Sequence, residues 1–275
     1  MNINMNIKDK EFRILTEYIY KNYGINLFQK KNLVEGRLSN IIIEKGFNNF
    51  TDYIDFVLSD KTGMEATVLV NKLTTNYTFF MREASHFEYF KDKVLPYLVS
   101  SLKERDMRVW SAGCSSGEEP YTLAMLLQEF FGTQKPLWDT KILATDISVK
   151  VLEEGERGIY SANALKHIPP LWKMQYFNKI GNENYKISSK IQNEVIFRVF
   201  NLMDEVYPFR RKFHTIFCRN VMIYFDYKTK INLVRKLYEH TEPGGYLFIG
   251  HSEFIPRETT DYKYIMPSIY RKGMI

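Results

Sequence analysis

A glycine- and serine-rich loop followed by two acidic residues is the part of this sequence best suited to hold a ligand. An apolar run leads into the loop at residues 113–117, and Glu118 and Glu119 open the apolar helix that follows. Glycine tolerates positive φ and has no Cβ, so it lets a backbone approach a ligand closely. The next apolar run ends at Asp146, where a nucleotide-type fold binds a ribose diol. Together these segments predict a cofactor pocket at the carboxyl edge of a parallel sheet.

The chemistry of this loop favours S-adenosylmethionine over a dinucleotide. A dinucleotide pyrophosphate is normally bound by a G-x-G-x-x-G turn at a helix N-terminus, and residues 113–117 lack that pattern. Glu118 and Glu119 would also repel a phosphate. S-adenosylmethionine has a sulfonium, an ammonium and a ribose diol but no phosphate, so an acidic pair suits it. A NAD-dependent oxidoreductase is disfavoured for the same reason.

Strand and helix patterns alternate around this loop and must position it. Such alternation predicts a parallel sheet covered by helices. A glycine-rich turn, Pro243-Gly244-Gly245, precedes the last of the expected strands. The expected strands are Arg108–Ala112, Lys141–Thr145, Thr215–Cys218 and Tyr246–Gly250, with helices between them, one of which is Lys228–His240.

The first 75 residues have helical spacing throughout. Gly24 is the expected end of the first helix, and the second ends near Gly46. Thr51 is the expected cap of the third helix, and Thr62 is the expected cap of a fourth that runs to Leu73. Their apolar stripes fit a helical core. The second helix also has a basic face, which is either solvated or a docking face for an acidic helix: Lys30, Lys31, Arg37 and Lys45.

The alternating pattern breaks between Tyr160 and Asn201. Tyr185–Ile187 and Val195–Phe197 resemble short strands around polar turns, which predicts a small antiparallel insertion. Residues 161–215 contain nine basic and four acidic side chains, so they carry +5 of the overall +6 charge. This region is either a solvated lysine-rich hairpin or a surface for an acidic partner. It has no continuous basic stripe with interleaved aromatics, so nucleic acid is not an expected partner.

The composition is that of a globular protein of a reducing compartment. The 275 residues include two cysteines, Cys114 and Cys218, which make no disulfide framework. No apolar run approaches the roughly 20 residues that span a bilayer, and the N-terminus is too polar for a signal peptide. We therefore expect a cytoplasmic protein without direct membrane insertion, and the sequence suggests no metal site.

Five ordered segments resemble the bacterial chemotaxis receptor methyltransferases, which methylate receptor glutamates with S-adenosylmethionine. The resemblance spans nearly the full length. It implies a Rossmann-like α/β methyltransferase sheet at residues 76–275, an all-helical domain at 1–75, an interdomain loop at 76–83, and a small antiparallel β insertion at about 161–200. The segments are Asn76–Glu83, Trp110–Tyr121, Ala144–Ser148, Phe217–Phe225 and Gly250–Glu253.

The resemblance also implies roles for individual residues. Arg82 and Tyr224 would lie nearest the transferred methyl group, and the product would be S-adenosylhomocysteine. The partners would be the cytoplasmic helical regions of methyl-accepting chemotaxis receptors. The cofactor would be held by Asn76, Thr78 and Arg82 of the interdomain loop, by Gly113, Glu118 and Asp146, and, on the adenosine side, by Asn201, Leu202, Arg219 and Asn220.

Structural roles remain open for several of these residues. Arg82 could pair only with Glu83 or Asp146, Tyr224 could be a core tyrosine, and Asp146 could cap the following helix. A glutamate nucleophile is already ionised at neutral pH, because its ordinary pKa is about 4.3. The reaction therefore needs no general base, which favours a structural hydrogen bond for His251 and a packing role for Cys114.

Two other functions are compatible with a cofactor pocket of this kind. One is methyl transfer to a different acceptor, such as a small molecule or RNA. The other is a module that binds S-adenosylmethionine as a sensor without turnover. The presence of Arg82, Glu118, Asp146 and Tyr224 together favours the enzyme.

Overall fold

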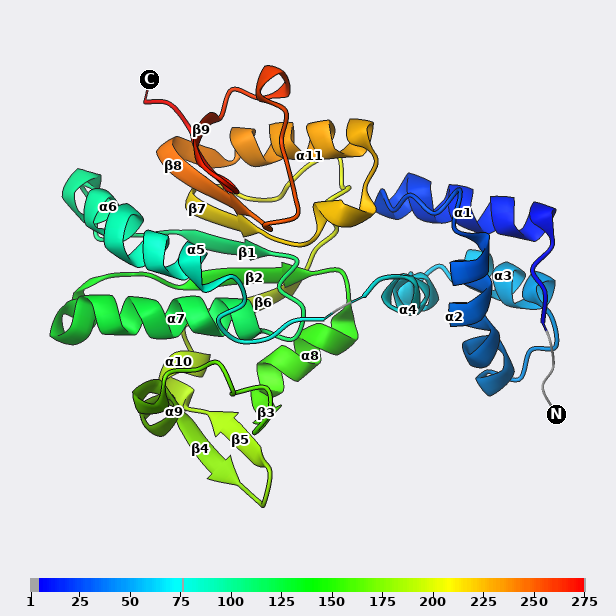
Figure 1. Cartoon of the computed structure of the whole chain (residues 1–275), viewed down its shortest axis with the longest axis horizontal. Helices are drawn as coiled ribbons and strands as arrows, with labels where there is room; N and C mark the ends of the chain where they lie inside the picture. Colours follow the sequence, from blue (N-terminus) through cyan, green and yellow to red (C-terminus); the bar gives the residue numbers. More distant parts are fainter. Residues whose placement is uncertain (1–4, 76, 275) are drawn as a thin grey trace. The chain divides into compact units, whose positions relative to one another are not determined.

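The computed structural model describes residues 5–75 and 77–274, which form two compact units (Figure 1). The first unit contains the described residues up to Thr75 together with Tyr224–Thr229. The second contains Tyr77–Ile223 and the chain from Lys230 onward. Each unit is described separately below.

Four α-helices account for most of the described part of the first unit. Gly24 ends the first helix in the left-handed conformation (φ 71°), as predicted, and its N–H donates to the carbonyl oxygen of Tyr20. The third helix is capped by Asn49, whose side chain accepts the N–H of Asp52, so the prediction of Thr51 as cap is wrong. Asparagine and threonine are both good caps, and the sequence offered both within three positions. The N-cap position of the fourth helix is Gly63, so the prediction of Thr62 is wrong as well. The helices are α1 (Asp9–Tyr23), α2 (Lys31–Glu44), α3 (Phe50–Ser59) and α4 (Met64–Leu73).

The basic face of α2 has partners inside its own unit. Lys31 pairs with Asp9, and Lys45 pairs with Glu65. Arg37 donates to the carbonyl oxygens of Leu73 and Thr74 at the C-terminal end of α4, at 2.9 and 3.0 Å. A cation at that end offsets the helix dipole. These residues therefore hold the helices of the unit together.

A seven-stranded sheet forms the centre of the second unit, in the order β6-β2-β1-β7-β8-β10-β9 (Figure 1). The five strands from β6 to β8 are parallel, whereas β10 and β9 are antiparallel to their neighbours. The chain passes from β1 to β2 on one side and later to β7 on the other, so the strand order reverses beside β1. Ligands of open α/β sheets bind at such a point. The strands are β1 (Val109–Ala112), β2 (Ile142–Asp146), β6 (Val195–Val199), β7 (Phe213–Cys218), β8 (Thr241–Ile249), β9 (Lys263–Met266) and β10 (Ile269–Arg271).

Aromatic side chains pack on both faces of this sheet. Successive residues of a strand point to opposite faces, so Trp110 and Ser111 of β1 do so. On the Trp110 face, the indole contacts the rings of Phe200 and Phe209. On the Ser111 face, Phe217 of β7 stacks on Phe248 of β8 with ring centroids 4.4 Å apart. These layers fix the strand positions that carry the site.

Helices cover the sheet and complete the alternating pattern. The segment before β1 buries four apolar side chains that lie at helical spacing, namely Phe87, Phe90, Val94 and Leu98. This segment contains one π-helical turn, a feature often found near functional sites. The elements are α5 (Ala84–Tyr89), the π-turn η1 (Phe90–Val94), α6 (Leu95–Ser101), α7 (Glu118–Phe131), α8 (Val149–Arg157) and α11 (Tyr227–Glu239), with the 3₁₀ turns η2 (Gly132–Leu137), η3 (Met222–Tyr224) and η4 (Arg257–Thr259).

A small antiparallel sheet of order β3-β5-β4 confirms the predicted insertion. The assignment of Val195–Phe197 to it is wrong, because β6 pairs in parallel with β2 at the edge of the main sheet. A short alternating strand does not reveal its partner, since its apolar face would fit either sheet. The insertion contains β3 (Ile159–Ser161), α9 (Pro170–Tyr176), β4 (Phe177–Ile180), β5 (Asn184–Ile187) and α10 (Ser189–Gln192).

The expected turn at residues 243–245 lies within β8 as an irregularity. Phe213 of β7 pairs with Thr241, whereas Thr215 pairs with Tyr246, so the intervening residues of β8 leave the ladder. A bulge of this kind bends a strand without ending it. Within the described part of the chain, no helix combines the length and apolar character that crossing a membrane requires.

We expect substitutions of two helical glycines to change stability in opposite directions. A Cβ on Gly155 of α8 would lie 2.7 Å from Cε1 of Phe197, whereas a Cβ on Gly36 of α2 would meet nothing within 4 Å. Gly155→Ala should lower the free energy of unfolding by about 1–3 kcal/mol through overpacking. Gly36→Ala should raise it by up to about 1 kcal/mol. Thermal and denaturant unfolding measure both effects, and an unchanged midpoint for Gly155→Ala would refute the close packing of α8 on β6.

Candidate active site

The loop between β1 and α7 adopts the left-handed backbone that its glycines permit. Gly113 and Gly117 have φ of 80° and 93°. A Cβ on Gly113 would lie 2.4 Å from Cγ2 of Val221, so this position has no room for a side chain. The N–H groups of Gly113 and Cys114 both donate to the carbonyl oxygen of Thr145, at 2.8 and 2.9 Å. The loop is thereby fastened to the end of β2.

Asp146 ends β2 beside this loop. Its carboxylate accepts the N–H of Ser115 at 2.9 Å and that of Ser148 at 3.0 Å. The cap of α8 is Ser148, whose side chain accepts the N–H of Val151, so Asp146 supports the turn before the helix without being its N-cap. Burial of the carboxyl raises the pKa of Asp146, and the two N–H groups oppose that effect.

Glu118 begins α7 on the other side of the loop. The residue is 6% exposed, and Oε2 accepts a hydrogen bond from the hydroxyl of Ser116 at 2.8 Å. Burial raises the pKa of Glu118. Glu118 and Asp146 thus place two shielded carboxyl groups at the carboxyl edge of the sheet. Such groups suit a ligand with cationic centres and hydroxyls.

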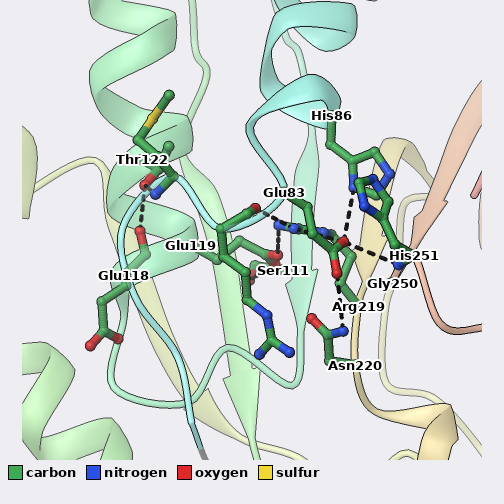
Figure 2. A network of polar contacts seen from close by, with 12 residues as sticks. Glu83, His86, Ser111, Glu118, Glu119, Thr122, Arg219, Asn220, Gly250 and His251 are labelled. Carbon is green, nitrogen blue, oxygen red and sulfur yellow. Dashed lines mark hydrogen bonds and ion pairs between the residues drawn. The ribbon is translucent and has the colours of Figure 1, made fainter. Parts of the chain in front are cut away.

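Arg219, directly after β7, lies in a buried network of charges (Figure 2). Its side chain is 2% exposed, and its terminal nitrogens pair with Glu119 at 2.8 Å and with Glu83 at 3.1 Å. One of these nitrogens also donates to the backbone carbonyl oxygen of Arg82. The guanidinium carbon lies 5.2 Å from the ring centroid of Phe87. Arg219 was predicted to line the adenosine side of the cofactor, but its guanidinium group is engaged by protein partners.

Arg82 lies between two residues with left-handed backbone, Met81 (φ 62°) and Glu83 (φ 57°). Its guanidinium donates to the carbonyl oxygen of Tyr77 at 2.7 Å. Phe80 is fully buried and makes edge contacts with the rings of Tyr160 and Phe177 of the small sheet, which fix the start of this segment. The segment is therefore strained and firmly anchored, a combination common at functional sites.

Asn220 is held from two sides. Its backbone is left-handed (φ 59°), and its N–H donates to Oε2 of Glu253 at 2.9 Å. Its side-chain amide donates to Oε1 of Glu83 at 3.3 Å. Glu253 also accepts the N–H groups of Gly250 at 2.6 Å and Ile223 at 3.2 Å. The turn after β7 thus has one conformation set by two carboxylates.

The other predicted site residues lie on separate segments. Asn201 and Leu202 follow β6, where the Asn201 side chain accepts the N–H of Met203 and Leu202 is buried. Thr78 is half-buried in the segment before Phe80. Tyr224 belongs to the first unit, where its hydroxyl donates to the carbonyl oxygen of Thr75 at 2.8 Å and accepts that residue's N–H at 3.0 Å. The prediction for Asn76 lies outside the described residues.

Glu83, His86 and His251 each offer a ligand atom within 4.8 Å of the others. The Arg219 guanidinium already pairs with Glu83, and its positive charge opposes a divalent cation at this place. Burial, followed by the charge of Arg219, lowers the pKa of His86 to about 3. His251 donates its backbone N–H to Glu83 at 3.2 Å, in keeping with a structural role. These residues extend the Arg219 network.

Three acidic residues of the site have partners that were not predicted from the sequence. Glu119 was expected only as part of an acidic pair for the cofactor, and Glu83 only as a possible partner of Arg82. Glu83, Glu119 and Glu253 all lie within segments that carry the family resemblance, and two of them adjoin predicted site residues. Their partners are distant in sequence, since Glu119 and Arg219 are 100 residues apart. The sequence could therefore have indicated that an acidic residue beside a predicted site residue belongs to the site. It could not have indicated which distant residue pairs with that acidic residue.

We expect Glu253→Gln to destabilise the second unit. The carboxylate accepts three backbone N–H groups, whereas a glutamine amide has one oxygen and would turn an N–H₂ group toward a donor. A buried donor left unsatisfied costs about 1–3 kcal/mol in unfolding free energy. Denaturant unfolding measures the loss, with Glu258→Gln at an exposed position as the matched control. Equal stability of the two variants would remove Glu253 from this role.

Comparison with known proteins gives two family-model matches that together cover most of the chain. The model described as "CheR methyltransferase, SAM binding domain" matches residues 76–270, where SAM denotes S-adenosylmethionine. The model described as "CheR methyltransferase, all-alpha domain" matches residues 10–74. Both parts of the chain are thus accounted for by one family.

Curated relatives agree with these matches. The chain is 44% identical to the chemotaxis protein methyltransferase of Borreliella burgdorferi, over 99% of this chain and 97% of the relative. It is 36% identical to that of Escherichia coli, over 90% of this chain and 85% of the relative. A probable chemotaxis protein methyltransferase of Rhizobium etli is 35% identical, over 93% of this chain and all (100%) of the relative. The chain therefore belongs to the CheR methyltransferase family and is an S-adenosylmethionine-dependent methyltransferase.

Proposed function

We propose that this protein transfers the methyl group of S-adenosylmethionine to glutamate side chains of chemotaxis receptors, forming methyl esters. The observation that carries the proposal is the pair of shielded carboxyl groups, Glu118 and Asp146, on either side of the loop after β1. Its relatives are named chemotaxis protein methyltransferases, which supports a receptor as the acceptor. A cytoplasmic location follows from such a partner.

The cofactor roles follow from the chemistry of the residues. Asp146 takes the ribose hydroxyls, as a carboxylate at the end of the second strand does in nucleotide-type folds. Glu118 attracts the cationic part of the cofactor. Gly113 is proposed to contact the cofactor through its backbone, because the space that a side chain would take is filled by Val221. The remaining contacts that we propose come from Asn76, Thr78, Arg82, Asn201, Leu202 and the backbone of Arg219 and Asn220.

Methyl transfer to a glutamate needs positioning more than acid–base catalysis. The receptor carboxylate is itself an ionised nucleophile, and alignment of oxygen, carbon and sulfur can contribute about 7–11 kcal/mol. Arg82 holds the incoming carboxylate by a charge-assisted contact. Tyr224 is proposed near the methyl group, as the family resemblance implies. Its hydroxyl hydrogen is donated to the carbonyl oxygen of Thr75, so binding of the second carboxylate oxygen requires exchange of that contact. The buried thiol of Cys114 has no part, because burial raises its pKa well above the ordinary value.

Alkali treatment of a labelled product tests the proposed acceptor. The full-length chain is incubated with methyl-labelled S-adenosylmethionine and membranes that contain chemoreceptors, and the product is then treated with base. A glutamate methyl ester releases volatile methanol, which is the expected result. Base-stable label on another molecule would reassign the acceptor, and cofactor binding without transfer to any receptor would indicate a sensor.

We expect Arg82→Ala to reduce turnover by at least about tenfold while leaving the protein folded, because a lost charge-assisted contact costs about 1.5–3 kcal/mol. Arg210→Ala, at an exposed position of the same unit, is the control and should keep full activity. Initial rates of methyl transfer measure both. Equal turnover of the two variants would exclude Arg82 from catalysis.

Cofactor affinity should fall as the pH is lowered through the raised pKa values of Glu118 and Asp146. Burial raises the pKa of Glu118 and of Asp146, and a cationic ligand binds the ionised forms, so binding releases protons where either group is partly protonated. Calorimetry in buffers of different ionisation enthalpy measures this release. S-adenosylhomocysteine lacks the sulfonium charge and should show a smaller effect. Identical pH dependence for the two ligands would contradict the assignment of Glu118.

A further inference from the structure

We propose that Glu119 is a positioning residue for methyl transfer, which acts through Arg219 on the backbone of Arg82. The inference rests on the proposed function, since it assigns Arg82 to the acceptor carboxylate. It gives the two neighbouring glutamates at the start of α7 different tasks. Glu118 serves the cofactor, and Glu119 serves the segment that carries Arg82.

Both carboxylate oxygens of Glu119 are used inside the protein. Oε1 accepts the hydroxyl hydrogen of Ser111 at 2.7 Å, and Oε2 accepts from Nη1 of Arg219 at 2.8 Å. The Glu119 side chain is 14% exposed and that of Arg219 is 2% exposed. Figure 2 shows these contacts on the sheet side of α7. Glu119 is thus placed to orient Arg219.

Arg219 in turn holds the backbone of the segment that contains Arg82. Its Nη2 donates to the carbonyl oxygen of Arg82 and to Oε2 of Glu83. Met81 and Glu83 both have left-handed backbone, which costs about 1–3 kcal/mol for each residue and persists only where other contacts enforce it. The hydrogen bond to the Arg82 carbonyl oxygen is one such contact. It fixes the backbone from which the Arg82 guanidinium extends.

Glu119 itself is poorly placed to be a second cofactor ligand. Its oxygens already accept from Ser111 and Arg219, whereas the hydroxyl of Ser116 is the partner of one oxygen of Glu118. Neutralising Glu119 leaves the guanidinium of Arg219 with Glu83 as its anionic partner. A glutamine can still accept one hydrogen bond from Ser111 or Arg219. The expected result is a folded protein in which the Arg82 segment is held less firmly.

The test compares two adjacent isosteric substitutions in the full-length chain. Glu119→Gln should lower kcat about tenfold and change the dissociation constant of S-adenosylmethionine less than about twofold. Glu118→Gln should instead raise that dissociation constant about tenfold. Glu153→Gln, at an exposed position of α8, controls for loss of a negative charge. A cofactor affinity weakened equally by Glu118→Gln and Glu119→Gln would overturn the division of roles.

A double-mutant cycle tests whether Glu119 acts through Arg82. In the Arg82→Ala background, Glu119→Gln should change kcat less than about twofold, because the side chain that it positions is gone. A full tenfold loss in that background would overturn the inference and leave the role of Arg82 intact. If Glu119→Gln fails to fold, Ser111→Ala replaces it in the double-mutant cycle with Arg82→Ala, because Ser111→Ala removes the hydrogen bond that orients Glu119. An unaffected turnover in Arg82→Ala alone would exclude Arg82 from catalysis and overturn the inference, whereas the proposed function is contradicted only if no base-labile label reaches the receptors.

Discussion

The site depends on one constraint, which is the burial of the positively charged guanidinium of Arg219. Arginine cannot shed its proton inside a protein, so carboxylates and carbonyl groups must surround it. Glu83, Glu119 and the backbone of Arg82 meet that requirement. Glu119 lies at the start of α7, whereas Arg82 and Glu83 are adjacent in the segment before α5. The buried cation, which follows β7, therefore joins these two segments to the end of β7. A single positive charge organises three pieces of backbone.

The cofactor region uses the opposite arrangement, because its carboxylates pair with no lysine or arginine among the residues that the structure describes. Glu118 and Asp146 are bound by hydroxyl and N–H groups, and burial raises the pKa of each. A ligand with a sulfonium and an ammonium group compensates these charges, whereas a phosphate would not. Glu118 and Glu119 are adjacent, but their charges have different partners. The charge of Glu119 is compensated by Arg219 inside the protein, whereas the charge of Glu118 is available to a ligand.

Much of this fold follows from local sequence signals. The apolar stripes, the stop at Gly24 and the alternation of strands and helices are local properties, and the structure confirms them. Pairings between distant segments were harder to foresee. The local sequence around β6 fits either sheet, and both asparagine and threonine are suitable N-caps for the third helix. The pairing of β6 with β2 and the cap at Asn49 could therefore not be chosen from local signals. For Arg219, the sequence predicted a place near the ligand, but the attachment of its guanidinium to Glu83 and Glu119 depends on the tertiary fold.

A crystal structure of the protein with S-adenosylhomocysteine would test this division most directly. We predict that the ribose hydroxyls contact the carboxylate of Asp146 and that Glu118 faces the amino-acid end of the ligand. We also predict that Arg219 keeps its contacts with Glu119, Glu83 and the Arg82 carbonyl oxygen. A structure in which the Arg219 guanidinium leaves these partners and binds the ligand would contradict the account.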